Sequence, residues 1–344
     1  LLVKLENSMY NSYERAEVKH DIKRILHKLW FIGEIFIEKP AIESELENAL
    51  HYFYKVFPEV LPFLDFRLKQ AWKESGFNPS LVEDTGAFPS VTFGNWVGGD
   101  RDGHPLVTAE ITERTLKAFR MHAFRLVIAQ LDDLSEKLSI YCHADQLIPE
   151  FRKRLGLLKD ETGALSSNEP FKLFVSLLKR KLPLEERSGG GLLLRDNKIS
   201  YRSSGELTDD LNLLKKALVE YGAWSLAGYD VQKVLRHLDI FGFHLARLDI
   251  RQNSQYYEEA LMDIVKASMP EMHKTLAKEK EAFRQFILDE LSHNRPFITR
   301  PDLLESDKAR EAVDTFRILT AHIRNYSERA LGNLIVSMTR NPWD

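Results

Sequence analysis

The sequence predicts a mostly α-helical protein that contains few, short strands. Apolar residues recur at spacings of three and four through most of the 344 residues, as they do in helices that bury one face. Glycine and proline, which interrupt helices, number only 17 and 13. Only two short segments carry the pattern of a strand. We therefore expect long helices joined by short loops.

Helices are predicted along most of the chain, in order from its amino end. The first places Val18, Ile22 and Ile25 on one face and ends before Pro40. The longest begins at Thr108, a residue typical of helix starts, although Glu110 is one position too early for a capping box. The predicted helices cover residues 9–36, 43–56, 60–73, 108–141, 169–180, 208–221, 231–238, 257–266, 274–292 and 307–326.

Two segments are predicted to be strands. Residues 243–251 alternate apolar and polar side chains near their end, and residues 334–339 form a short, β-branched apolar run typical of a buried strand. Because this second run lies so close to Asp344, we expect the 344 residues to be one partial domain of a longer chain. Residues 187–192, which include three consecutive glycines, are expected to form a flexible loop.

The composition excludes several classes of protein. Lysine and arginine total 48 against 51 acidic residues, so the formal net charge of −3 leaves no excess of basic residues for binding nucleic acid. No run of about 18 uncharged apolar residues occurs, so we expect no membrane-spanning segment. Lys4 and Glu6 interrupt any signal-peptide core, and the single cysteine, Cys142, suits a reducing compartment. We therefore expect a cytoplasmic protein that binds neither nucleic acid nor membrane.

Residues 77–107 form the least helical and most glycine-rich stretch of the chain. Gly98, Gly99 and Gly103 allow positive φ angles, so backbone N–H groups there can turn towards an anion. The Asp-Arg-Asp run at 100–102 places a guanidinium between two carboxylates, which can fix its direction. A tight surface turn held by local ion pairs is the alternative interpretation. The spacing fits neither an EF-hand, a dinucleotide-binding loop nor a P-loop.

A second group of charges lies on the predicted strand that ends at Arg251. Arg247, Asp249 and Arg251 point to one side of this strand, while the apolar residues between them face the other. Two arginines and a carboxylate at the carboxyl end of a strand suit an anionic substrate. An edge strand with a solvated, charged face is the alternative. The 11 histidines form no pattern typical of a metal site.

Together these segments resemble the phosphoenolpyruvate carboxylase family. Residues 93–105, FGNWVGGDRDGHP, are similar to the family signature FGSWxGGDRDGNP, and residues 107–112, VTAEIT, to its NVTxEVT continuation. Residues 241–252, FGFHLARLDIRQ, resemble the family strand FGxxLxxLDIRQ. Weaker similarities follow in the same order at residues 29–40, 168–171 and 335–339. The resemblance therefore spans almost the whole chain, which corresponds to an internal portion of the family's N-terminal half.

The resemblance implies a carbon–carbon lyase that converts phosphoenolpyruvate and bicarbonate to oxaloacetate and phosphate through carboxyphosphate and an enolate, with Mg²⁺ or Mn²⁺. It also implies a helix-rich fragment of an incomplete (β/α)₈ barrel and a cytoplasmic homo-oligomer, which is a tetramer in the family. Arg251 matches the family's catalytic, substrate-binding arginine, and Trp96 matches a tryptophan of the pocket for CO₂. The other candidate substrate-binding residues are Arg247, Gly98, Gly99, Asp100, Arg101 and Asp102.

Some parts and residues of the family pattern are missing from the sequence. The TAHPT segment with its catalytic histidine and the HGRGG-type loops do not occur. The metal carboxylates and the active-site lysine of the family are not matched either, so the metal ligands are expected outside this chain, and the chain alone is expected to be inactive. His104 replaces an asparagine, Asn253 a glutamate, and residues 31–37 lack the family's polar and arginine residues. The departures at residues 31–37 favour an alternative, a non-catalytic helical scaffold or divergent paralogue of the same fold.

Overall fold

The computed structural model describes residues 11–31, 41–82, 88–102, 106–186, 192–293 and 304–341. The chain divides into two compact units, Leu1–Ala41 and Ile42–Asp344. The described part of the first unit is helix α2 (Ser12–Phe31), none of whose residues is buried. The remainder of the helix predicted at 9–36 and residues 187–191 of the expected flexible loop lie outside the described residues.

The second unit is mostly helical, so the predicted fold class is confirmed at this level. Most of its helices lie close to the predicted ranges, because each buries an apolar face of the expected periodicity. Its α-helices are α3 (Ile42–His51), α4 (Phe57–Glu74), α5 (Ala109–Lys137), α6 (Pro149–Thr162), α7 (Pro170–Arg180), α8 (Ser204–Tyr221), α9 (Gln232–Phe241), α10 (Ser254–Ser268), α11 (Pro270–Leu276), α12 (Lys280–Leu291) and α13 (Asp307–Asn325).

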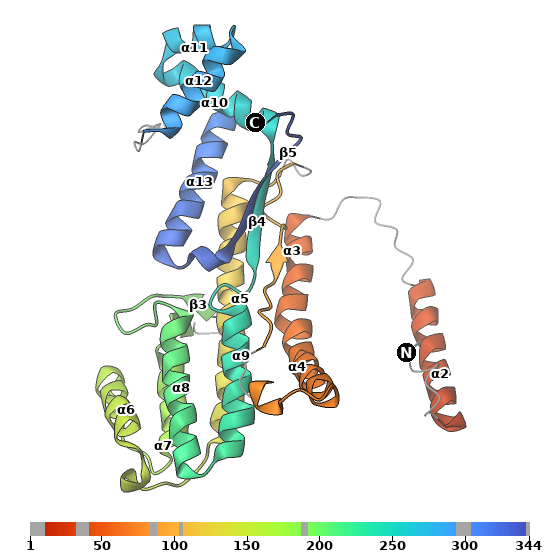
Figure 1. Cartoon of the computed structure of the whole chain (residues 1–344), viewed down its shortest axis with the longest axis vertical. Coiled ribbons are helices and arrows are strands. Elements are labelled where there is room, and N and C mark those ends of the chain that lie inside the picture. Colours follow the sequence, from red (N-terminus) through yellow and green to blue (C-terminus); the bar gives the residue numbers. More distant parts are fainter. Residues whose placement is uncertain are drawn as a thin grey trace. The chain divides into compact units, whose positions relative to one another are not determined.

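Three parallel strands form the sheet of this unit (Figure 1). The central strand, β4 (Arg247–Asn253), pairs with β1 (Gly94–Asn95) on one side and with β5 (Leu331–Ser337) on the other. A separate antiparallel pair joins β2 (Leu184–Glu186) to β3 (Leu192–Leu194). Neither this pair nor β1 was predicted, because segments of two or three residues are too short to show an alternating pattern.

A bulge shifts the register between β4 and β5. Leu248 pairs with Leu331, but Ile250 pairs with Leu334, so two residues of β5 lie opposite the single residue Asp249. The Oδ1 atom of Asp249 accepts a 2.7 Å hydrogen bond from the backbone N–H of Asn333. A Cβ atom at position 332 would lie 2.2 Å from the same oxygen, so only glycine fits there.

Helix α5 connects the two large hydrophobic clusters of the second unit. Its carboxyl-terminal half, including Phe124 and Leu131, packs with α6 to α9. Its amino-terminal half, including Leu116 and Phe119, packs with the buried face of β4 in the second cluster. Because α5 is held on both sides, the loop that precedes it is fixed against the sheet.

The helices predicted at 43–56 and 60–73 are not separated by a break. A π-helical turn (Tyr52–Val56) continues directly into α4, with Pro58 in its first turn and Pro62 inside it. The prediction that Pro58 ends a helix is therefore wrong. Proline lacks the N–H that an α-helix needs, and the wider π turn changes the backbone hydrogen bonds just before Pro58.

Both predicted strands begin and end at different residues from those expected. Strand β4 starts at Arg247 instead of residue 243, because Leu245 has a φ of +64° that no strand accommodates. Strand β5 runs from Leu331 to Ser337 and ends where Met338 adopts a φ of +55°. Most of β5 is exposed, so the expectation of a buried strand is wrong for the chain as described. The helix predicted at 274–292 is also divided, between α11 and α12.

Candidate functional site

The charged residues of β4 lie on one face, as the alternation predicts. Arg247, Asp249 and Arg251 are half-buried, whereas the residues between them are buried. The buried face packs on α5, so the opposite face remains for polar contacts. Arg247 and Arg251 are four residues apart, which separates them by about 13 Å along a strand. The structure therefore places only Arg251 near the carboxyl ends of the strands.

The loop after β1 continues the pairing with β4. The N–H of Arg251 donates to the carbonyl of Gly99 at 3.0 Å, and the N–H of Arg101 donates to the carbonyl of Arg251 at 2.9 Å. Gly98 has a φ of +84°, and a Cβ atom there would lie 2.1 Å from Oγ1 of Thr115. A Cβ atom on Gly99 would lie 2.0 Å from the carbonyl oxygen of Asp249. Both glycines are therefore needed for the loop to fit between α5 and β4.

Asp100 and Arg251 form a two-pronged ion pair across this loop. Nε of Arg251 donates to Oδ1 of Asp100 at 2.8 Å, and Nη2 donates to Oδ2 at 2.7 Å. The hydrogen bonds from Arg251 to Asp100 raise the pKa of the guanidinium, so Arg251 is always charged. Within the described residues, no hydrogen-bond partner is found for Nη1 of Arg251. The carboxylate thus fixes the direction of the arginine and leaves donors for a further anion.

Asp102 connects the same loop to the third strand. Its Oδ2 atom accepts a 2.6 Å hydrogen bond from the hydroxyl of Ser337, the last residue of β5. The N–H of Asp102 donates to Oδ1 of Asp100 at 3.1 Å. Asp100, Asp102, Arg251 and Ser337 therefore gather at the carboxyl ends of the three parallel strands, a position that we call the carboxyl edge.

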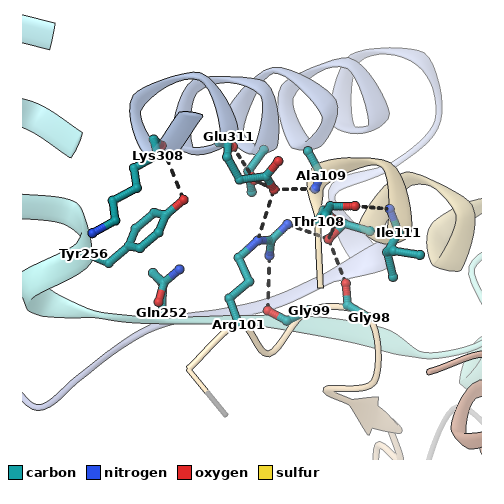
Figure 2. A network of polar contacts seen from close by, with 12 residues as sticks. Gly98, Gly99, Arg101, Thr108, Ala109, Ile111, Gln252, Tyr256, Lys308 and Glu311 are labelled. Atoms are coloured by element: carbon teal, nitrogen blue, oxygen red, sulfur yellow. Dashed lines mark hydrogen bonds and ion pairs between the residues drawn. The ribbon is translucent and has the colours of Figure 1, made fainter. Parts of the chain in front are cut away.

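Arg101 has different partners, and Figure 2 shows its guanidinium directed towards Glu311. Its side chain is only 5% exposed and lies 3.8 Å from Oε1 of Glu311 on α13. It also donates to Oγ1 of Thr112 at 2.7 Å and to the carbonyl of Gly99 at 3.3 Å. The expectation that Arg101 lies between the carboxylates of its two neighbours is wrong, because those carboxylates bind Arg251 and Ser337 instead.

Burial and the charge of Glu311 shift the pKa of Arg101 in opposite directions. Burial lowers the pKa of its guanidinium, and the carboxylate of Glu311 partly reverses that effect. Glu311 also accepts a hydrogen bond from the N–H of Ala109, the first residue of α5. The loop, α5 and α13 are thus joined through one buried arginine, which positions the loop instead of facing solvent.

The remaining predicted residues, Trp96 and Arg247, lie at the margins of this site. Trp96 is 65% exposed, and its carbonyl accepts hydrogen bonds from the N–H groups of Gly99 and Asp100, at 2.9 and 3.0 Å. Arg247 begins β4, and its N–H donates to the carbonyl of Phe93 at 2.8 Å. Trp96 therefore lies in the same turn as Asp100, the ion-pair partner of Arg251, whereas Arg247 does not.

Sequence reasoning missed two residues that hold the loop. Thr112 accepts from Arg101 and donates to the carbonyl of Gly98 at 2.7 Å. It lies in the first turn of α5, where a threonine hydroxyl often bonds a nearby carbonyl. Its position in the sequence was therefore a weak indication that it holds the loop. Glu311 carries no such signal, because it meets Arg101 only through the tertiary fold.

Two searches of the described residues gave negative results. No group of three or more histidine, cysteine, aspartate or glutamate side chains gathers there in a way that could hold a metal ion. Asp100 and Asp102, the carboxylates of the carboxyl edge, already bind Arg251 and Ser337. In the same described ranges, the helices are all too short or too polar to cross a membrane.

Comparison with known proteins gives a consistent result over the whole chain. The family model for phosphoenolpyruvate carboxylase matches residues 1–344. Phosphoenolpyruvate carboxylase of Methylorubrum extorquens is 29% identical over 100% of this chain and 38% of its own length. Those of Trichormus variabilis and Bradyrhizobium diazoefficiens are 29% and 28% identical over 96% and 100% of this chain, and 33% and 36% of their own lengths.

The matched region contains every residue of the carboxyl edge, including the Asp100–Arg251 pair and the loop that carries Trp96. The chain spans between 33% and 38% of the length of these three relatives. From the match to its whole length, we conclude that this chain belongs to the phosphoenolpyruvate carboxylase family.

Proposed function

We propose that this chain is a portion of an enzyme that carboxylates phosphoenolpyruvate with bicarbonate, and that it supplies part of the substrate site. The Asp100–Arg251 pair at the carboxyl edge carries this proposal. Active sites of barrel enzymes lie at the carboxyl ends of parallel strands, which is where Arg251 lies. Its family counterpart is the substrate-binding arginine, so the position and the residue type agree.

The fold proposed for the complete enzyme is an incomplete (β/α)₈ barrel of which this chain is a part. Three parallel strands in the order β1-β4-β5, connected through helices, support this proposal. The segment between β4 and β5 contains α10 to α13, far more than one crossover needs. The extra helices fit the helix-rich character of such a barrel, with the additional strands outside this chain.

In the proposed site, Arg251 binds the phosphate or carboxylate of phosphoenolpyruvate. Asp100 occupies Nε and Nη2 of Arg251, so the end of the guanidinium with Nη1 is available to the substrate. As the phosphoryl group passes to bicarbonate, negative charge develops on the enolate, and a fixed cation stabilises it. The loop lies next to this position, because the carbonyl of Gly99 accepts the backbone N–H of Arg251.

Trp96 has a separate proposed role in the same reaction. Carboxyphosphate releases CO₂, which must stay near the enolate to form the carbon–carbon bond of oxaloacetate, with phosphate as the other product. An apolar wall excludes the water that would protonate the enolate. The exposed Trp96, in the turn that leads to Asp100, is in place to supply part of such a wall.

The family's divalent metal, Mg²⁺ or Mn²⁺, does not fit the residues that the structure describes. Of the carboxylates at the carboxyl edge, Asp100 and Asp102 already bind other side chains, and no larger group of metal-ligating side chains is described. We propose that the metal ligands belong to the rest of the enzyme. A cytoplasmic homo-oligomer, a tetramer by analogy with the family, is part of the same proposal.

The test uses the complete protein that contains this segment. Arg251→Ala is expected to lower kcat/KM by about 10²–10³, because it removes a charge where negative charge develops. Arg251→Lys is expected to be nearly as poor, since an ammonium cannot bind Asp100 and the substrate through one planar fork. The assay follows oxaloacetate with malate dehydrogenase and NADH.

Arg67→Ala is the matched control, because Arg67 is exposed on α4 and contacts only Gln70 in the described structure. It is expected to leave turnover unchanged. Normal turnover in both Arg251 variants would show that the Asp100–Arg251 pair only holds the loop.

A second candidate is a non-catalytic helical scaffold of the same family. The closed Asp100–Arg251 pair favours it, because a neutralised arginine can serve structure alone. In that case the complete protein would have no carboxylase activity before any substitution, whereas the first candidate requires bicarbonate-dependent turnover by the unmodified protein. The same assay therefore separates the two.

A further inference from the structure

A cavity of about 240 Å³ lies near the amino ends of β4 and β5, away from the carboxyl edge. Its wall includes Phe243 and His244, which precede β4, and Tyr326, Ser327, Arg329 and Ala330, which precede β5. Strand β4 begins at Arg247, four residues before Arg251, so about 13 Å of strand separates this cavity from Arg251. The cavity is thus a different place from the proposed substrate site.

The ionisable side chains that line the cavity are all basic, apart from the phenol of Tyr326. Arg120 reaches it from α5, Arg202 from the turn before α8, and Arg329 from the turn before β5. Two carboxylates lie just outside the wall: Asp196, which is 61% exposed, contacts Arg120 at 3.4 Å, and Glu206 accepts a 3.1 Å hydrogen bond from the backbone N–H of Arg202. A cavity with three guanidiniums and no carboxylate in its wall favours an anion.

Two histidines in the wall have ring nitrogens that can donate a hydrogen bond to a ligand. His244 is 7% exposed and His322 is 9% exposed. In the part of the chain that the structure describes, neither imidazole has a hydrogen-bond partner. Burial, assisted by nearby arginines, lowers the pKa of each to about 4. Both rings are therefore neutral near pH 7, and each has an N–H available to donate.

The amino end of α8 supplies a third kind of donor. Ser203 caps this helix of 18 residues, and Ser203, Ser204 and Gly205 all line the cavity. The first turn of a helix has unpaired N–H groups and a partial positive charge, both of which suit an anion. The amino end of α8 contributes to an anion site here because the arginines and the buried histidines lie beside it.

We propose that this cavity binds a phosphate-class oxyanion, either free phosphate or the phosphoryl group of a small monoester. Arg202 and Arg329 supply charge from the rim, Arg120 supplies charge from inside, and the first turn of α8 supplies N–H donors. A tetrahedral dianion accepts several hydrogen bonds at once, which matches donors that arrive from α5, α8, α13 and two loops. The cavity also leaves room for a short organic group.

Calorimetric titration of the 344-residue chain tests this proposal, with inorganic phosphate and glycerol 3-phosphate as separate probes. Saturable binding of either probe is expected. Tighter binding of glycerol 3-phosphate would identify the site as one for a monoester, and equal or weaker binding would identify free phosphate as the ligand. Arg202→Gln and Arg329→Gln are each expected to weaken binding by about tenfold, since each removes a charge-assisted contact.

Arg202 and Arg329 are exposed, so their substitution leaves the core intact. Arg317→Gln removes the same charge from an exposed position of α13 outside the cavity and is expected to leave binding unchanged. Absence of saturable binding, or equal loss in the Arg317 variant, would overturn the proposal.

A spectroscopic readout makes the result specific to the cavity. In protein with labelled histidines, the resonances that disappear in His244→Gln and His322→Gln identify the two rings. Addition of phosphate is expected to shift these two resonances and to leave that of His237, which lies outside the cavity, in place. Binding without any shift of either resonance would assign the anion to another surface.

Discussion

Gly99 shows how a single residue decides the geometry of the loop. The sequence predicted glycines that turn N–H groups towards an anion. In the structure the N–H of Gly99 donates to the carbonyl of Trp96, and a different constraint requires glycine there. The loop passes so close to β4 that a Cβ atom on Gly99 would lie 2.0 Å from the backbone oxygen of Asp249. Backbone cannot move aside as a flexible side chain can, so the loop itself would have to move.

Gly99→Ala is therefore expected to lower the free energy of unfolding by about 1–3 kcal/mol, measured by urea denaturation. Gly156→Ala is the matched control, because nothing lies within 4 Å of its Cβ position in α6. Alanine there is expected to be neutral or slightly stabilising. Equal stability of the two variants would mean that the loop lies farther from β4 than described.

His237 makes stability depend on pH. It is 4% exposed, and its Nε2 atom lies 3.2 Å from the carbonyl oxygen of Pro58. Burial, with help from Lys233 and Arg236, lowers the pKa of His237 to about 4. The unfolded histidine titrates near 6.5, so between pH 6.5 and 4 the unfolded chain binds more protons than the folded chain.

The contribution of His237 to the free energy of unfolding is therefore complete above pH 6.5. It is lost as the pH falls towards 4, by about 3 kcal/mol. Urea denaturation at pH 7.0 and 5.0 is expected to show a smaller difference in His237→Gln than in the unmodified chain. His293, which is exposed near the end of α12, provides the control variant His293→Gln. A difference as large in His237→Gln as in the control would contradict this account.

Single residues of the site differ in how far sequence alone reveals them. Arg251 was predictable, because a period of two on one strand is a local property. Its partner Asp100 is 151 positions away, and which carboxylate pairs with which arginine depends on the tertiary register of the loop. The inward direction of Arg101 and its contact with Glu311 have the same origin, so local ion pairs were the wrong expectation.

At the scale of elements, α5 is the helix that positions the site. Thr108 caps it, and its Oγ1 atom accepts a 3.3 Å hydrogen bond from the N–H of Ile111. The start of this helix was predicted within one residue, because threonine is a strong N-cap. Its end was predicted four residues too late, because Leu138 and its neighbours leave the helix to enter the core around α7.

Thr108→Ala is expected to lower the free energy of unfolding by about 1 kcal/mol, since it leaves an N–H of the first turn without its partner. Thr320→Ala on the exposed face of α13 is the control, expected to change the same free energy by less than about 0.5 kcal/mol. Chemical denaturation followed by circular dichroism measures both. A similar loss in the two variants would show that the cap contributes nothing of its own.

Strand β5 shows where an element-scale prediction fails. Its β-branched, apolar sequence is typical of a buried strand, yet most of its residues are exposed in this chain. Leu334 and Ile335 are 54% and 38% exposed. An apolar, β-branched sequence indicates that a strand is suited to packing against other apolar residues. Whether such neighbours are present cannot be known from the pattern of the strand itself.

At the scale of the whole molecule, we propose that the chain supplies only part of the substrate site. Residues that act as a unit lose nearly all activity when several of them are missing. We therefore expect the 344-residue chain to show no carboxylase turnover in the coupled assay. We also expect no Mg²⁺-dependent binding of phosphoenolpyruvate in the micromolar range by calorimetry. Bicarbonate-dependent turnover by the purified chain would show that it holds a proton acceptor and metal ligands among its own residues.

The same chain is expected to associate with itself. Exposed apolar residues on β5, together with the unpaired edge of that strand in the described structure, favour contact between copies. Sedimentation velocity at increasing concentration is expected to show rising average mass. The mostly helical class and the family followed from local periodicity and motifs. Which faces are covered did not, because that is a property of the complete assembly.

The π turn between α3 and α4 keeps two faces in phase. Phe53 lies in the turn and Leu61 lies eight residues later, yet both belong to one hydrophobic cluster. In an ideal α-helix eight residues rotate by about 80° beyond two full turns, which would point Leu61 elsewhere. One additional residue absorbed by the turn reduces that rotation to about −20°. Deleting one of residues 54–56 would leave seven steps of an ordinary α-helix, which turn through the same angle, so the chain can lose a residue in this turn without changing which face of α4 meets the cluster.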